Sequence, residues 1–133
     1  SQVIVVCAKI EAELAELPPE EIVAFWTTLG ISENGLQQLI RTSYALLHLV
    51  TFLTAGEDEC RAWTIEGGTK ARQAAGKIHS DIERGFIAAE IVAYDALIKA
   101  GSMAAAKEKG WVRLEGEDYL MKDGDITYFK FNV

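Results

Sequence analysis

The sequence predicts an α+β fold in two parts, because the pattern of residues changes near His48. Residues 1–48 show the apolar spacing of helices and an excess of glutamate, whereas residues 49–133 contain short β-rich runs separated by helical stretches. A length of 133 residues with 50% hydrophobic content is enough for one compact core plus an appended element. We therefore expect two domains, with the boundary at residues 48 and 49.

The first part is predicted to begin with a strand. Residues 3–6, VIVV, form a continuous β-branched run of the kind that is buried on both faces in a parallel sheet. The next forty residues have helical spacing and supply no partner strand. We therefore expect the rest of that sheet to lie upstream of this sequence.

An acidic helical hairpin should follow this strand. A short Glu-rich segment at residues 10–17 is stopped by two prolines, and residues 20–29 then resume helical spacing up to Gly30. Ser32 is a candidate N-cap for a longer helix. The apolar face of that helix is made of Leu36, Leu39, Ile40, Tyr44 and Leu47.

The second part is predicted to be a small mixed sheet. The runs VTFLTA and CRAWTI suggest a hairpin, with Gly56 and three acidic or polar residues as its loop. Gly67 and Gly68 close the second strand, Thr69 is a candidate cap for a helix through Ile78, and Gly85 precedes the strand FIAAEIV.

The remaining elements complete this pattern. Gly101 interrupts the second helical stretch, and Ser102 can cap its second half. The tail supplies the runs WVRL, YLM and ITYFKFNV, and the Asp123-Gly124 pair between the last two predicts a tight hairpin. The order β-β-α-β-α-β-β fits a sheet with a helix across one face, which is the β-grasp or ubiquitin-like architecture.

Composition narrows the class of protein. A net charge of -7 disfavours a protein that coats nucleic acid non-specifically, so any RNA contact must be local, and no DNA specificity is expected. Cys7 and Cys60 lack metal-type spacing, and the apolar opening lacks the basic start of a secretory leader. No apolar run approaches the roughly 20 residues of a membrane span. We expect a reduced, cytoplasmic setting without a membrane partner.

The tripeptide Ala75-Gly76-Lys77 resembles the end of a phosphate-binding loop, but the full pattern fails. Such a loop needs an earlier glycine and a hydroxyl residue after the lysine, whereas Ala71 and Ile78 occupy those positions. This chain alone is therefore not expected to hydrolyse a nucleotide or to contain catalytic residues.

A basic cluster on the same helix is the main candidate binding site. Lys70, Arg72 and Lys77 lie close to Arg84, and a helix start adds amides and partial positive charge that suit a phosphate. Asp81 and Glu83 weaken the cluster. An ordinary solvated helix face explains these charges about as well.

Other polar and aromatic residues are better explained by structure. His48 and His79 lack the partners of a metal or catalytic site, and His79 is expected to pack or to cap a helix. Glu90 and Asp95 suggest paired carboxylates, but hydrogen bonding to nearby backbone is the safer explanation. The aromatic residues expected in the core are Phe52, Trp63, Phe129 and Phe131, although an exposed aromatic residue on such a sheet could stack on a base.

Several long segments, taken together, resemble the C-terminal part of the YchF or Obg-like ATPase family. They cover nearly the whole chain, and the stretch from Gln73 to Glu90 is the most specific of them. The segments are VIVVCAKIEAEL, GLQQLIR, LLHLVTFLTAGEDECRAWTI, GTKARQAAGKIHSDIERGFIAAEIVAYD and RLEGEDYLMKDGDITYFKFNV.

The resemblance implies that residues 49–133 form a TGS domain, a β-grasp module, and that residues 1–48 are the C-terminal remnant of a P-loop G domain. It also implies that Cys7, Ala8 and Lys9 correspond to the loop that contacts the nucleotide base. Family members bind ATP or GTP with Mg²⁺ and associate with ribosomes. The implied partners are the ribosome, rRNA or tRNA, and the upstream nucleotide-binding domain, while this chain itself holds no cofactor.

The sequence departs from the family at the basic helix. Thr-Ala-Pro usually precedes Gln-Ala-Ala, whereas this chain has Lys70, Ala71 and Arg72, which makes the cluster more basic. Three hypotheses remain: a regulatory RNA- or ribosome-binding module, a ubiquitin-like module that binds a protein regulator, or a part that completes the nucleotide pocket of a larger enzyme.

Overall fold

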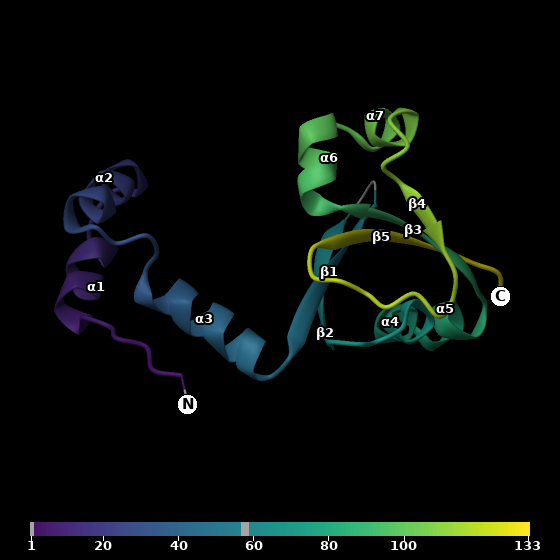
Figure 1. Cartoon of the computed structure of the whole chain (residues 1–133), viewed down its shortest axis with the longest axis horizontal. Coiled ribbons are helices and arrows are strands. Elements are labelled where there is room, and N and C mark those ends of the chain that lie inside the picture. The colour runs from purple at the N-terminus through teal and green to yellow at the C-terminus, as the bar shows by residue number, and fades with distance from the viewer. Residues whose placement is uncertain (1, 57–58) are drawn as a thin grey trace. The chain divides into compact units, whose positions relative to one another are not determined.

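The computed structural model describes residues 2–56 and 59–133. The chain divides into two compact units, Ser1–Leu47 and His48–Val133. The first unit is helical, and the second combines a sheet with helices (Figure 1). The α+β class predicted from the sequence is confirmed.

The first unit contains three helices, α1 (Ala8–Ala15), α2 (Pro19–Leu29) and α3 (Gly35–Leu46). Gly30 ends α2 as predicted, with a left-handed φ of 68°. The N-cap of α3 differs from the prediction, because the side chain of Asn34 accepts a hydrogen bond from the Gln37 amide at 2.7 Å. Ser32 lies two residues too early to fill this role.

The predicted strand at residues 3–6 is wrong. This segment is extended but pairs with no other described segment, and the side chains of Val3 and Val5 are 84% and 86% exposed. A β-branched run becomes a strand only where neighbouring strands accept its backbone hydrogen bonds, and the described part of this unit contains none. Much of the apolar face of α3, including Leu36 and Leu39, is exposed as well.

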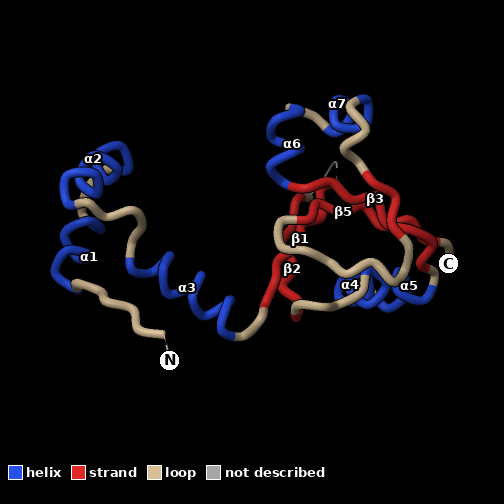
Figure 2. Tube along the Cα trace, viewed as in Figure 1, coloured by secondary structure: helices blue, strands red, loops and turns tan. Residues whose placement is uncertain are grey.

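The second unit is built on a five-stranded sheet in the order β2-β1-β5-β3-β4 (Figure 2). β1 and β5 are parallel, while the other neighbours are antiparallel. The strands are β1 (Leu49–Ala55), β2 (Cys60–Glu66), β3 (Phe86–Ala93), β4 (Arg113–Glu115) and β5 (Asp125–Phe131). The predicted loop between β1 and β2 includes Glu57 and Asp58, which lie outside the described residues.

Helices pack against both faces of the sheet (Figure 1). α4 (Ala71–Ile78) and α5 (Ser80–Arg84) cover one face, where Phe52, Ala75 and Phe129 belong to the larger core cluster. α6 (Tyr94–Ala100) and α7 (Met103–Glu108) cover part of the other face, around Val92 and Ile126. Successive residues of a strand point to opposite faces, which is why Ile91 and Val92 belong to different clusters.

In the second unit, the helix boundaries predicted at Gly101 and Ser102 are confirmed, and the one predicted at Thr69 is wrong. Gly101 ends α6 with a φ of 80°, and the Ser102 hydroxyl caps α7 by accepting a hydrogen bond from the Ala105 amide at 3.1 Å. Thr69 does not cap α4. Its hydroxyl donates instead to the Glu66 carbonyl at 2.7 Å, and Lys70 occupies the N-cap position.

The predicted hairpin at Asp123-Gly124 is also wrong. Asp123 Oδ1 accepts a hydrogen bond from the Thr51 amide at 2.7 Å, and the Gly124 amide donates to the Thr51 carbonyl at 2.8 Å, so this turn attaches to β1. Both edges of β5 are already paired, with β1 and β3. Leu120 instead forms an isolated bridge with Lys70.

Among the described residues, no helix combines the length and the apolar character needed to cross a membrane.

Candidate nucleic-acid interface

The predicted basic cluster lies at α4 and α5, and its backbone amides are already occupied. The Ala71 amide donates to the Tyr119 carbonyl at 2.8 Å and the Arg72 amide to the Glu117 carbonyl at 3.4 Å. The Lys70 amide donates to the side chain of Gln73 at 3.3 Å. An anion at this helix start would therefore meet side-chain cations rather than free amides.

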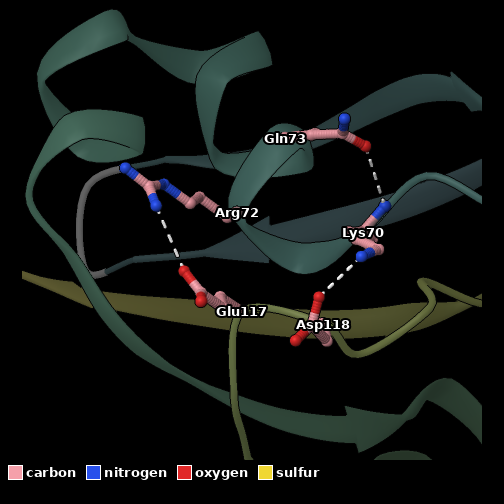
Figure 3. Close-up of polar contacts among 5 residues, drawn as sticks. All are labelled: Lys70, Arg72, Gln73, Glu117 and Asp118. Atoms are coloured by element: carbon pink, nitrogen blue, oxygen red, sulfur yellow. Dashed lines mark hydrogen bonds and ion pairs between the residues drawn. The ribbon is translucent and has the colours of Figure 1, made fainter.

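Two of these cations are paired with carboxylates from the segment that precedes β5 (Figure 3). Lys70 Nζ lies 2.6 Å from Asp118 Oδ1, and Arg72 Nη1 lies 3.1 Å from Glu117 Oε2. The hydrogen bond to Asp118, reinforced by its charge, raises the pKa of Lys70. Since all four side chains are about half exposed or more, these pairs are weak and can exchange for a stronger anion.

The other two predicted contact residues differ in their partners. Arg84 forms an ion pair with Asp81 one turn earlier in α5. Lys77 is exposed in the last turn of α4, and within residues 2–56 and 59–133 it has no ion-pair partner. His79 Nδ1 accepts the Asp81 amide at 3.1 Å, which confirms its predicted role as a helix cap.

Cys7, Ala8 and Lys9 lie in the first unit, where α1 begins. Cys7 is the N-cap residue, and its carbonyl accepts the Glu11 amide at 3.0 Å. All three side chains are exposed. They are therefore open to a ligand, although the segment before them is not a strand.

Glu90 has a role that the sequence did not reveal. Its carboxylate lies 2.7 Å from Lys130 Nζ of β5 and 2.9 Å from Lys107 Nζ of α7, so the predicted bonding to backbone is wrong. Hydrogen bonds from Lys130 and then Lys107 lower the pKa of Glu90. The strand register brings Lys130 near Glu90, since Glu90 pairs with Tyr128 and Ala88 with Lys130, while Lys107 comes from α7.

The aromatic predictions are mostly confirmed. The Phe52 ring lies 6.5 Å from that of Trp63 and 6.0 Å from that of Phe129. Phe131, by contrast, is 44% exposed, so its predicted core position is wrong because it lies at the end of β5, beyond the main core.

Comparison with known proteins identifies the family of the second unit. Residues 49–132 match the family model YchF-GTPase_C, described as a protein of unknown function (DUF933). The chain belongs to this family. The YchF match covers the whole second unit except its two end residues.

Several YchF relatives extend the similarity over both units. The ribosome-binding ATPase YchF of Bacillus subtilis is 60% identical over 133 residues, which are 100% of this chain and 36% of the relative. Obg-like ATPase 1 of rice is 46% identical over 127 residues, covering 96% of this chain and 32% of the relative. The chain thus spans about a third of the length of these relatives.

A solved structure gives the same result. The Schizosaccharomyces pombe YchF GTPase superposes with a TM-score of 0.80 at 37% identity, covering 94% of this chain and 33% of that protein. The predicted resemblance to the YchF and Obg-like ATPase family is confirmed.

Proposed function

We propose that this chain is the C-terminal portion of a ribosome-associated nucleotide hydrolase, and that His48–Val133 is a TGS module that binds ribosomal RNA. The similarity over all 133 residues to a relative named a ribosome-binding ATPase carries this proposal. The sheet order, with parallel first and last strands at the centre, supports a β-grasp module. This function places the protein in the cytoplasm.

The nucleotide chemistry is assigned to the rest of the protein. Within the described residues, no three His, Cys, Asp or Glu side chains form a group that could hold Mg²⁺. Cys7, Ala8 and Lys9 are exposed at a helix start and suit a loop beside the nucleotide base, while the phosphate-binding loop is missing from this sequence. We therefore propose residues 1–48 as the end of a G domain that binds ATP or GTP, and derive no catalytic step from them.

The RNA contacts are proposed to come from Lys70, Arg72, Lys77 and Arg84. Lys77 forms no ion pair with a described carboxylate, and the paired cations are exposed enough to exchange partners. An RNA phosphodiester carries one negative charge, as a carboxylate does, and its two non-bridging oxygens can pair with Arg in the same bidentate geometry. Release of condensed counterions from RNA then favours the exchange.

The test is cosedimentation of the chain with purified ribosomes at low and moderate salt. The Lys70→Glu/Arg72→Glu variant should lose salt-sensitive binding, because it replaces two cations with anions. Arg41→Glu/Lys122→Glu carries the same change in net charge elsewhere and serves as the matched control.

Two other results of the cosedimentation experiment would overturn or replace the proposal. Equal binding by the two variants and the unmodified chain would overturn the contact residues. Binding that persists at high salt and without RNA would replace the proposal with a protein-interaction module, since phosphate contacts weaken steeply with salt.

A further inference from the structure

Trp111 is a large aromatic residue that neither hydrophobic core uses. It lies between α7 and β4, its side chain is 39% exposed, and it belongs to neither core cluster. Trp63 shows how a tryptophan with a structural role is held, since it packs against Phe52 and its indole nitrogen donates to Thr54 Oγ1 at 3.0 Å. The Trp111 ring, by contrast, is in cation-π contact with Lys109, and the rest of the indole is exposed.

The Trp111 side chain lines a cavity of about 500 Å³. This shallow space lies between the start of α6 and the chain that enters β4, and small or apolar side chains supply much of its wall. Besides Trp111, the residues that line it are Ala93, Asp95, Ala96, Lys99, Gly110 and Arg113. A space of this size with a flat aromatic wall suits a planar ring.

The cations around this cavity differ from those at α4. Lys109 Nζ lies 4.7 Å from the centre of the Trp111 ring, and neither Lys109 nor Lys99 has an ion-pair partner within the described ranges. Arg113 Nη1 forms an ion pair with Glu115 Oε1 at 3.2 Å. Asp95 is the acidic residue of the cavity wall, so two unpaired lysines outnumber it.

We propose that this cavity, the Trp111 site, binds one unpaired nucleotide of an RNA strand. The base stacks on the exposed indole, which is sequence-tolerant because every base has a π face. The neighbouring phosphates contact Lys99 and Lys109, and the Asp95 carboxylate can accept a hydrogen bond from an exocyclic amino group. An acidic peptide would use the lysines but leave the indole face uncovered.

This proposal goes beyond the binding surface at α4 and does not require a ribosome. It concerns a different part of the second unit and makes a prediction for a free oligonucleotide. Two phosphate contacts on a single strand give a logarithmic salt slope of about -1.4. Affinity should therefore fall roughly sevenfold when the salt concentration is raised fourfold.

The experiment uses the whole chain with Trp26→Phe and Trp63→Phe, so that Trp111 is the single indole fluorophore. A short unstructured RNA of adenine and cytosine is expected to quench its emission. The same RNA is then given a fluorescent label, and its binding to chains that keep Trp26 and Trp63 is measured by fluorescence anisotropy. Trp111→Ala should weaken it by roughly 5- to 150-fold, as expected for the loss of one stacked base.

Matched variants separate stacking from charge. Trp111→Tyr should retain most of the affinity, while Lys99→Gln/Lys109→Gln should flatten the salt dependence. Tyr128→Ala removes another exposed aromatic residue and should leave binding unchanged, because Tyr128 lies away from the cavity wall. Far-ultraviolet circular dichroism of each variant verifies that the fold is intact.

Three results would overturn the Trp111 site. RNA that binds without quenching, or equally well to the Trp111→Ala chain, would exclude base stacking. Equal binding of a polyglutamate peptide would assign the site to acidic proteins, and displacement by inorganic phosphate at the same concentration as RNA would reduce it to an anion site. Ribosome binding through Lys70 and Arg72 could survive any of these results, so the two proposals fail separately.

Discussion

The phenolic hydroxyl of Tyr119 donates a hydrogen bond to Oδ2 of Asp125 at 3.0 Å. Asp125 begins β5 and is only 3% exposed, and the same oxygen accepts the Lys122 amide at 2.9 Å. Arg113 Nη2 donates in turn to the Tyr119 oxygen at 3.1 Å. Burial raises the pKa of the Tyr119 phenol, so it remains a donor to the buried carboxylate. This short network fixes the start of the central strand.

Replacing Tyr119 with Phe should destabilise the second unit by about 1–2 kcal/mol, because the buried Asp125 carboxylate loses a donor. Urea unfolding followed by circular dichroism measures the difference. Tyr128→Phe is the matched control. Its ring is 57% exposed, and its change should stay within about 0.5 kcal/mol. Equal effects of the two substitutions would show that the network adds nothing to stability.

Gly85→Ala should be costly although the glycine has an ordinary negative φ. An added Cβ would collide with the Asn132 backbone carbonyl, and the Asn132 amide already donates to the Gly85 carbonyl at 2.9 Å. Forcing these segments apart should cost about 1–3 kcal/mol. A Cβ added at Gly116 would have no neighbouring atom within 4 Å, so Gly116→Ala should be neutral or slightly stabilising. Thermal unfolding of the two variants should therefore diverge, and matching transitions would refute the close approach.

The Glu90 ion pairs should make stability depend on acid pH. Since Lys130 and Lys107 lower the pKa of Glu90, the contribution is present above the unfolded value of about 4.3 and is lost as the pH falls through the folded pKa. Glu90→Gln should cost about 0.5–1 kcal/mol near neutral pH and nothing in strong acid. Urea titrations across this range test the prediction. Glu66→Gln, at an exposed position, should show no such change, and a pH-independent Glu90→Gln effect would contradict the assignment.

Neutralising Glu117 and Asp118 should strengthen ribosome binding if the proposed contact surface is correct. Glu117→Gln/Asp118→Asn removes the carboxylates that hold Arg72 and Lys70, so both cations become available to phosphate. Cosedimentation should show several-fold tighter binding with a steeper salt dependence. Glu20→Gln/Glu21→Gln makes the same change in net charge in α2. If both variants gained equally, the effect would be one of overall charge.

The sequence predicted those features that depend on a few neighbouring residues. Gly30 and Gly101 end their helices because the chain turns into the left-handed region there, and β1 and β2 follow from β-rich composition. These signals are local, so no knowledge of the rest of the chain was needed.

Features that depend on distant partners were not predictable in the same way. The run at residues 3–6 has strand composition but no described partner, and Asp123-Gly124 has a hairpin signal although β5 pairs elsewhere. The partners of Lys70 and Arg72 were hidden for the same reason. Asp118 and Glu117 lie beside α4 because backbone hydrogen bonds and the Leu120–Lys70 bridge hold their segment against the start of that helix.

The place of β5 in the sheet also bears on how the second unit folds in time. Leu53 of β1 pairs with Ile126 of β5, so the centre of the sheet joins two segments that lie far apart in the chain. The long stretch of chain between β1 and β5 must close into a loop before the two strands can pair. The entropy lost in closing that loop is offset only once the strand contacts form, and this slows folding. Until β5 arrives, β1 and β3 each leave an edge unpaired, and those edges can pair with another chain. During synthesis, the unit therefore has to wait for its last strand, with open edges in the meantime.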